Sequence, residues 1–294
     1  MNLLSFIKQA ESTLSQVAES PALEARVLLA RAIDRPASFI LAHPNLELSP
    51  EQLHAAKTLL QKRAARMPLP YVVGRWEFFG LEFIVSPDVL IPRPETELLV
   101  ELAIAFVRKN ALETVNIIDV GTGSGCIAVS IAANLPGARI TATDISPAAL
   151  RIARQNAQKH GVDGRIEFVE CDLFPDKVEG RKWQISPLST FHYDLILSNP
   201  PYIPTATMKT LEIYGKEPTL ALDGGADGLV TTRGLLEQAT GRLNPRGKML
   251  IEIESSLGLA AKALAQQHFP SSQIEIVKDL AGLDRILSIE RLLP

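Results

Sequence analysis

Apolar positions along the chain change their spacing near residue 75. Before that point they recur at helical intervals, as at Leu23, Val27 and Ala30, which is the period of a helix that buries one face. Ser49-Pro50 has the form of an N-cap followed by proline at the first helical position, and Gln52 completes a capping box. We therefore predict an all-helical N-terminal domain over residues 1–72.

Residues 73–91 follow a different pattern, in which strand-forming aromatic residues stand on both sides of a glycine. Trp76, Phe78 and Phe79 precede Gly80, and Phe83 follows it. Two such runs separated by a short turn predict a β-hairpin. We interpret this hairpin as the linker to a second domain.

From residue 92 to residue 294, short apolar runs alternate with helical segments. This alternation is typical of an α/β domain in which helices cover both faces of a mostly parallel sheet. Seven strands are expected, at 115–120, 138–143, 165–170, 193–198, 247–253, 273–278 and 285–291.

A glycine-rich turn directly follows the first of these strands. Glycines between a strand and a helix allow a ligand to approach the backbone closely. The dinucleotide fingerprint requires Gly or Ala where Cys126 stands. The spacing Asp-x-Gly-x-Gly-x-Gly instead resembles the cofactor loop of class I S-adenosylmethionine (SAM) methyltransferases. The expected cofactor contacts of this segment are Asp119, Gly121, Thr122, Gly123, Ser124 and Gly125.

The next two strands also end in acidic residues. Asp144 and Ile145 follow the second strand, 23 positions after Gly121, where an acid can accept hydrogen bonds from both ribose hydroxyls. The third strand ends in Asp172-Leu173. In the family that the loop resembles, an acid at this position meets the adenine amine and its neighbour packs on the ring. Both pairs are therefore expected to contact the cofactor.

The fourth strand ends in Asn199-Pro200-Pro201-Tyr202. Adjacent prolines fix the backbone and remove two N–H donors, and ligands of open α/β sheets bind at the carboxyl ends of central strands. The Asn199 side-chain oxygen and the Pro200 carbonyl are suited to accept both hydrogens of a planar NH2 group, while Tyr202 offers an aromatic face. We predict catalytic roles for Asn199, Pro200 and Tyr202, substrate contact by all four residues, and a further cofactor contact by Asn199.

This set of groups suits methyl transfer to a weak nitrogen nucleophile. The nitrogen of a carboxamide or an adenine amine is a poor nucleophile because its lone pair is delocalised. Two hydrogen bonds favour tetrahedral geometry at that nitrogen, and holding it about 3–3.5 Å from a methyl group removes several kcal/mol of the barrier. No strong base is needed, because the proton becomes acidic once the nitrogen carries the methyl. A protein amide and an adenine are both open as acceptors at this point.

Composition and charge further limit the classes of protein to which the chain can belong. Hydrophobic residues make up 46% of the chain and charged residues 21%, which is ordinary for a globular protein. A formal net charge of −3 gives no global basic field for nucleic acid, and neither a membrane span nor a signal peptide is expected. Cys126 and Cys171 form no disulfide framework or zinc-ligand pattern. We interpret them as small buried fillers and expect no metal.

Several segments together resemble the HemK/PrmC protein-glutamine N5-methyltransferases, which modify peptide chain release factors. Asn-Pro-Pro-Tyr is shared with adenine-N6 methyltransferases, whereas the segments around Arg93 and Glu217 belong more to the release-factor group. The resemblance covers nearly the whole chain and is carried by Phe79-Gly80-Leu81-Glu82-Phe83, Leu90-Ile91-Pro92-Arg93-Pro94-Glu95-Thr96-Glu97, the glycine loop, Asn199-Pro200-Pro201-Tyr202-Ile203, Glu217-Pro218, Ala221-Leu222-Asp223-Gly224-Gly225-Ala226-Asp227-Gly228-Leu229 and Asp279-Leu280-Ala281-Gly282-Leu283-Asp284-Arg285.

The resemblance implies a Rossmann-like class I SAM-dependent methyltransferase fold with a seven-stranded, mostly parallel sheet. It implies SAM as cofactor, S-adenosylhomocysteine as product, and the glutamine of a release-factor Gly-Gly-Gln motif as acceptor. Arg93 and Glu217 are then expected at the mouth of the site, in contact with substrate, and the helical domain is expected to grip the release factor. We further expect a monomer in the bacterial cytoplasm, with an organelle matrix as the alternative location, and no sequence-specific nucleic-acid binding.

Two features depart from the family pattern. The fifth strand usually ends in Glu-Ile-Gly with a glutamine three residues later, but here it reads Glu252-Ile253-Glu254, with Leu257 at the glutamine position. We expect altered packing rather than lost activity. Residues 176–190 are long for a connection to the fourth strand, and we expect a surface excursion near the adenine pocket.

Other functions stay open on the sequence. The main alternative is adenine-N6 methylation of DNA or RNA, because the same pocket would accept a flipped base. Residues 1–70 carry a formal charge of +2, which leaves −5 for the remainder and disfavours this alternative. A non-catalytic binding module is disfavoured by the intact motifs, and a nicotinamide-dependent oxidoreductase by the glycine spacing.

Overall fold

The computed structural model describes residues 1–175 and 192–292, and the chain divides into two compact units, Met1–Trp76 and Glu77–Pro294. The division lies within the predicted linker of residues 73–91. The expected excursion at 176–190 falls outside the described residues.

The first unit is helical. Its core consists of apolar side chains such as Phe6, Leu28 and Leu29, all fully buried. The capping box at the start of its fourth helix is present, with Ser49 and Gln52 bonding each other's backbone reciprocally. The helices are α1 (Leu3–Leu14), α2 (Pro21–Ile33), α3 (Ala37–Ala42), α4 (Pro50–Ala64) and α5 (Leu69–Val73).

The predicted hairpin is present as β1 (Arg75–Phe78) paired with β2 (Leu81–Ile84). Phe78 and Phe83 are buried in the core of the second unit, with their rings edge to face. The Asn156 side chain brackets β2, accepting a hydrogen bond from the Ile84 N–H at 2.7 Å and donating one to the Ile84 carbonyl at 3.0 Å. Asn156 also donates to the Ser124 carbonyl at 2.8 Å, so one buried amide joins the hairpin to the glycine loop.

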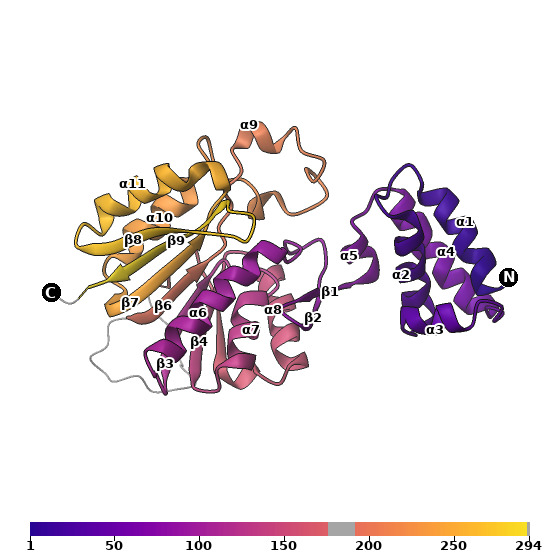
Figure 1. Ribbon diagram of the computed structural model, residues 1–294, viewed down its shortest axis with the longest axis horizontal. Coiled ribbons are helices and arrows are strands. Elements are labelled where there is room, and N and C mark those ends of the chain that lie inside the picture. The colour runs from indigo at the N-terminus through magenta and orange to yellow at the C-terminus, as the bar shows by residue number, and fades with distance from the viewer. Residues whose placement is uncertain (176–191, 293–294) are drawn as a thin grey trace. The chain divides into compact units, whose positions relative to one another are not determined.

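A seven-stranded sheet forms the centre of the second unit, in the order β5-β4-β3-β6-β7-β9-β8 (Figure 1). All neighbours pair in parallel except β9, which is antiparallel to both β7 and β8. All seven expected strands are present, at β3 (Val115–Val120), β4 (Ala138–Asp144), β5 (Ile166–Glu170), β6 (Tyr193–Ser198), β7 (Leu243–Glu252), β8 (Ser272–Lys278) and β9 (Asp284–Arg291).

Helices cover both faces of this sheet. Alternation along β3 directs Ile117 into the core under α6 (Glu97–Lys109) and α7 (Cys126–Asn134), and Ile118 into the core under α10 (Val230–Ala239) and α11 (Gly258–His268). α8 (Pro147–Lys159) packs on the first of these faces, beside α7. The remaining short helices are η1 (Pro94–Thr96), η2 (Asp163–Arg165), α9 (Thr205–Met208), η3 (Thr219–Ala221) and η4 (Ser255–Leu257).

The strand order reverses at β3. The chain runs outward from β3 through β4 to β5, then returns to the other side of β3 with β6 and continues to β7. In an open α/β sheet a crevice forms beyond the carboxyl ends of the strands at such a switch point. The topology therefore gathers the glycine loop and Asn199 at one edge of the sheet.

Candidate active site

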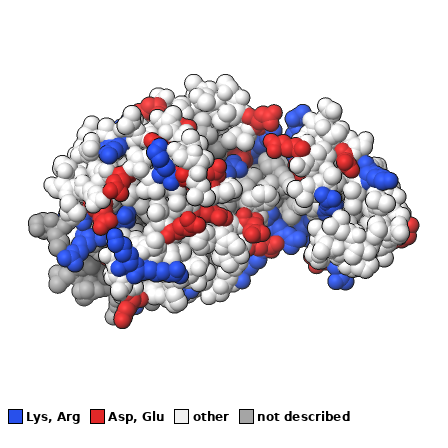
Figure 2. Space-filling view, viewed as in Figure 1, with Lys and Arg blue, Asp and Glu red and all other residues white. Residues whose placement is uncertain are grey.

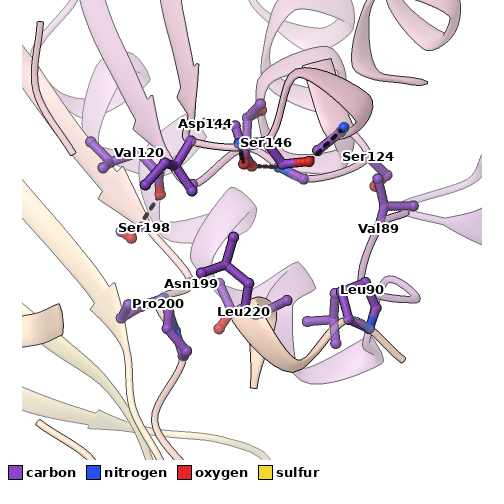
Figure 3. Close-up of a pocket in the computed structure, with 18 of the residues that line it drawn as sticks. Val89, Leu90, Val120, Ser124, Asp144, Ser146, Ser198, Asn199, Pro200 and Leu220 are labelled. Atoms are coloured by element: carbon purple, nitrogen blue, oxygen red, sulfur yellow. Dashed lines mark hydrogen bonds between the residues drawn. The ribbon is translucent and has the colours of Figure 1, made fainter. Parts of the chain in front are cut away.

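A cavity of about 440 Å³ lies at this switch point, which is within the usual range for small-molecule sites. Figure 3 shows side chains from the ends of several strands around it. Ser198 donates to the Val120 carbonyl at 2.8 Å, which joins β6 to β3 at the cavity wall. The wall includes the predicted residues Arg93, Gly121, Thr122, Gly123, Ser124, Asp144, Ile145, Asp172, Leu173, Asn199, Pro200 and Pro201.

The three glycines of the loop have different surroundings, although all adopt positive φ. A Cβ at Gly121 or Gly123 would meet nothing within 4 Å, and both residues line the cavity. A Cβ at Gly125 would lie 3.1 Å from the Cβ of Ala153 in α8, and Gly125 does not line the cavity. The first two glycines thus leave room for a ligand against the backbone, and the third permits close helix packing.

Asp119 does not line the cavity, in contrast to its predicted cofactor contact. It is fully buried, and its Oδ2 accepts hydrogen bonds from the Thr122 hydroxyl at 2.6 Å and the Ala128 N–H at 3.2 Å. Burial raises the pKa of this carboxyl to about 7. The acid therefore stabilises the loop from behind, because its position at the strand end turns its side chain into the core.

Asp144 does face the cavity. Its Oδ2 accepts a hydrogen bond from the Gly123 N–H at 2.9 Å, and its Oδ1 accepts one from the Ser146 N–H at 2.8 Å. A carboxylate has about four acceptor positions, so two remain for a diol in the cavity. Burial raises the pKa of Asp144. The two backbone hydrogen bonds oppose this shift and fix the orientation of the carboxylate.

Asp172 and Leu173, which follow β5, also line the cavity. The Thr143 hydroxyl donates to the Leu173 carbonyl at 2.8 Å, which fixes the loop after β5 against β4. Both cysteines also reach the wall, Cys126 buried and Cys171 partly exposed. Burial raises the pKa of the Cys126 thiol to about 12. This thiol is therefore protonated near neutral pH and is a poor nucleophile.

The Asn-Pro-Pro-Tyr segment forms the opposite end of the cavity. Asn199 Nδ2 donates to the Thr96 hydroxyl oxygen at 3.0 Å. Tyr202 lies in a smaller adjoining cavity together with Arg93 and Asn199, and its hydroxyl donates to Glu252 Oε1 at 3.4 Å. Burial, followed by the charge of Glu252, raises the pKa of this phenol.

Two glycines downstream pack against the backbone of this segment. A Cβ at Gly224 would lie 2.7 Å from the Tyr202 Cα, and one at Gly228 would lie 2.5 Å from the Tyr202 carbonyl oxygen. These positions exclude any other residue, because no side chain fits at such distances. The glycines therefore determine where the Asn-Pro-Pro-Tyr backbone lies and take no part in chemistry.

Arg93 and Glu217 form an ion pair beside the cavity. Arg93 lines both cavities, whereas Glu217 is buried and does not line either of them. One Glu217 oxygen accepts from the Arg93 guanidinium and the other from the Ile91 N–H at 3.2 Å. The structure thus places Glu217 behind Arg93, as its support, rather than at the mouth as predicted.

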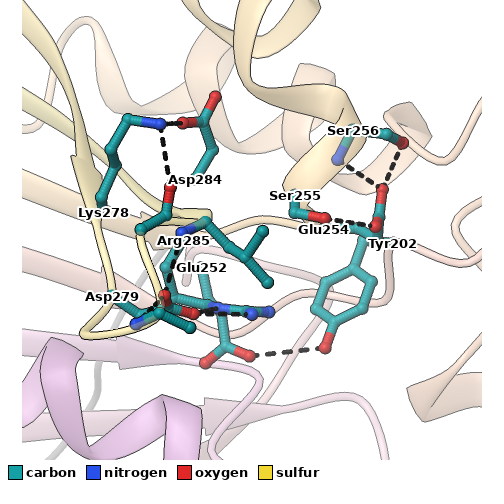
Figure 4. A network of polar contacts seen from close by, with 12 residues as sticks. Tyr202, Glu252, Glu254, Ser255, Ser256, Lys278, Asp279, Asp284 and Arg285 are labelled. Carbon is teal, nitrogen blue, oxygen red and sulfur yellow. Dashed lines mark hydrogen bonds and ion pairs between the residues drawn. The ribbon is translucent and has the colours of Figure 1, made fainter.

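The two residues that depart from the family pattern lie near Tyr202. Glu254 has extended φ and caps η4, bonding the Ser256 N–H and both adjacent serine hydroxyls, so this position needs no glycine. Leu257 packs against the apolar core and comes within 3.2 Å of a Cβ built at Gly228. Figure 4 shows the hydrogen bonds of Glu254 with Ser255 and Ser256. Neither Glu254 nor Leu257 lines the cavity.

Thr96 and Glu252 are site residues whose roles the sequence did not indicate. Thr96 lines the cavity from the end of η1, and Glu252 lies behind it at the end of β7. Glu252 is 1% exposed, and burial raises its pKa to about 7. Thr96 occurs in a segment that carries the family resemblance, and Glu252 in the strand end that departs from the family pattern. Neither observation indicates the role of these residues in the site.

Acidic and basic side chains are mixed over the surface of the second unit. Figure 2 shows acidic and basic side chains interspersed on the viewed face. Among residues 1–175 and 192–292, no helix has both the length and the apolar character that crossing a bilayer requires. Within the same described part of the chain, no group of three or more His, Cys, Asp or Glu residues is arranged to bind a metal ion.

Comparison with known proteins identifies relatives over both units. A family model described as the PrmC N-terminal domain matches residues 5–74, and one described as the methyltransferase small domain matches residues 96–213. A release factor glutamine methyltransferase of Moorella thermoacetica is 42% identical over 268 residues, which is 91% of this chain and 90% of that protein. One from Geobacter sulfurreducens is 37% identical, over 92% of this chain and 89% of that protein.

Solved structures bear on the fold. The hMettl16 catalytic domain, in complex with a MAT2A 3′UTR hairpin, aligns with a TM-score of 0.54 at 17% identity, over 80% of this chain and 81% of that one. Together with the family matches, this confirms the predicted class I methyltransferase fold.

Proposed function

This chain belongs to the release factor glutamine methyltransferase family, and we propose that it transfers a methyl group from SAM to the side-chain amide nitrogen (N5) of the glutamine in a release-factor Gly-Gly-Gln motif. The observation that carries this proposal is one continuous cavity that joins the glycine loop and Asp144 at one end to Asn199 and Pro200 at the other. A cofactor and an acceptor amide can meet there.

The glycine-loop end of the cavity fits SAM. Asp144 has two acceptor positions left for the ribose hydroxyls, while Gly121 and Gly123 leave the backbone open to the ligand. Asp172 is suited to accept from the adenine amine, and Leu173 and Ile145 to pack on the ring. When bound, SAM supplies an electrophilic methyl group on a positively charged sulfur.

The Asn199 end of the cavity fits a carboxamide. We assign Asn199 Oδ1 and the Pro200 carbonyl as acceptors for the two amide hydrogens, and Tyr202 as the flat surface beside the acceptor. Proline at 200 and 201 has no N–H, so this segment cannot donate to a strand ladder. No general base is required, because the amide proton is lost to solvent after transfer, and the protonated Cys126 thiol is unsuited to that role.

Arg93 is proposed to contact the substrate at the cavity mouth, with Glu217 as its buried anchor. The helical unit Met1–Trp76 is proposed to help bind the release factor. Action as a monomer is proposed as well. The bacterial cytoplasm is the proposed location.

The test is mass spectrometry of an unmethylated release factor incubated with the protein and SAM. We expect a gain of one methyl on the Gly-Gly-Gln glutamine, and none with Asn199→Ala. A parallel reaction with DNA and RNA addresses the alternative. Methylation of nucleic acid without methylation of release factor would overturn the proposal in favour of an adenine acceptor.

A further inference from the structure

The Asn199 carboxamide can act as proposed only in one of its two orientations. A carboxamide has an acceptor end and a donor end, and rotation by 180° exchanges them. With Oδ1 toward the cavity, Asn199 accepts from the NH2 of the acceptor. With Nδ2 toward the cavity, two donors face each other and the acceptor is repelled. Some group must therefore select the orientation.

Thr96 is the group that contacts the donor end. Its Oγ1 lies 3.0 Å from Asn199 Nδ2, and the residue is 2% exposed at the cavity wall. A hydroxyl can both accept and donate, and in this contact the Thr96 oxygen accepts. The contact therefore favours the orientation in which Nδ2 is turned away from the acceptor.

Asn199 is the donor in this contact, because its Nδ2 donates and the Thr96 hydroxyl oxygen accepts. Asn199 Oδ1 is then left to face the cavity. Glu252, at the end of β7, accepts from the Tyr202 hydroxyl at 3.4 Å (Figure 4).

We propose that Thr96 is a positioning residue, which accepts a hydrogen bond from Asn199 Nδ2 and so keeps Asn199 Oδ1 directed at the acceptor nitrogen. This inference rests on the proposed amide chemistry. It joins two side chains, Thr96 from η1 and Asn199 from the end of β6.

The test compares Thr96→Val with Thr96→Ser. Valine has the shape of threonine without the hydroxyl, and serine retains the hydroxyl. Thr232→Val is the matched control, because Thr232 is equally buried and its Oγ1 has no hydrogen-bond partner among the described residues. We expect Thr96→Val to lower kcat for release-factor methylation about tenfold, the loss of one well-placed hydrogen bond. SAM affinity should be unchanged, Thr96→Ser should recover most of the activity, and Thr232→Val should behave as wild type.

A second measurement reads the Asn199 orientation without any turnover. The Asn199 side-chain amide protons are observed by ¹⁵N NMR in wild type and assigned by their absence in Asn199→Ala. We expect them to exchange with solvent about tenfold more slowly in wild type than in Thr96→Val, because Thr96 protects one of them.

The outcomes separate the two proposals. An inactive wild type would overturn the proposed function, and the exchange measurement would then decide the role of Thr96 by itself. An active wild type with full activity in Thr96→Val would overturn the inference alone. A Thr96→Val variant that loses SAM binding as much as turnover would also overturn it, because that result indicates a structural role.

Discussion

The two ends of the cavity are built by different kinds of contact. At the glycine-loop end, the Asp119–Thr122 and Asp144–Ser146 contacts join residues three and two positions apart, and Gly123–Asp144 spans 21. At the acceptor end, the Thr96–Asn199, Tyr202–Glu252 and Arg93–Glu217 contacts span 103, 50 and 124 positions. Cofactor binding thus depends on short strand-to-helix turns, whereas acceptor orientation depends on distant segments brought together by the sheet.

This difference predicts that substitutions at the two ends affect different steps. Changes at the glycine-loop end should weaken SAM binding and leave the acceptor geometry intact. Changes at the acceptor end should lower turnover or raise the KM for release factor while SAM affinity is preserved. A variant that lowers both equally would show that the two ends are not independent.

The largest effect is expected for Asn199→Ala. Removing the carboxamide leaves the acceptor nitrogen without one of its two hydrogen-bond partners and without alignment, so turnover should fall by about 100-fold or more. SAM affinity, measured by calorimetry, should change by less than about threefold, since most SAM contacts are at the other end. Turnover near the wild-type value would contradict the role of Asn199.

Asp144→Ala is expected to weaken SAM binding by roughly 10- to 100-fold. The substitution removes the proposed ribose acceptor and also the partner of the Gly123 and Ser146 N–H groups, and a hydrogen bond to a charged group contributes about 1.5–3 kcal/mol. Glu101→Ala, an exposed acid on α6, is the control. Unchanged SAM affinity in Asp144→Ala would exclude the ribose assignment.

Arg93→Ala and Glu217→Gln are expected to raise the KM for release factor by about five- to tenfold each. Because Glu217 is buried and reaches the substrate only through Arg93, the double variant should be no worse than the more severe single variant. The coupling is measured as a double-mutant cycle on kcat/KM. Additive effects would indicate that Glu217 contacts the substrate independently.

The smallest effect is expected on the pH dependence of stability. Burial raises the pKa of Glu252 from 4.5 to about 7, so between these values the folded state binds more protons than the unfolded state. The free energy of unfolding should therefore fall as pH rises through this window. Glu252→Gln should reduce this decrease in the free energy of unfolding by on the order of 1 kcal/mol. The measurement is denaturant unfolding at several pH values. The pKa of Asp119 is also raised to about 7, so this carboxyl accounts for a residual slope in the variant. An unaltered slope would show that Glu252 is ionised throughout.

Local pattern was sufficient for most of the fold and for the glycine-loop end of the site. The seven strands were predictable because their apolar runs are bounded by turn residues, and Asp144 was predictable because it follows a strand at a set distance from Gly121. Asp119 and Gly125 were predicted to contact the cofactor, but in the structure both are buried and support the loop from inside the core. Sequence spacing identifies a loop without showing which of its side chains face outward.

The sequence by itself determined the family and the order of the motifs along the chain, and it predicted Asn199-Pro200-Pro201-Tyr202 as the acceptor segment. Only the tertiary structure decided that Thr96 contacts Asn199 and that Glu217 supports Arg93. The physical reason is that these contacts join segments 103 and 124 positions apart. No local periodicity encodes such contacts, which exist only after the sheet has placed the ends of β6 and β7 beside η1.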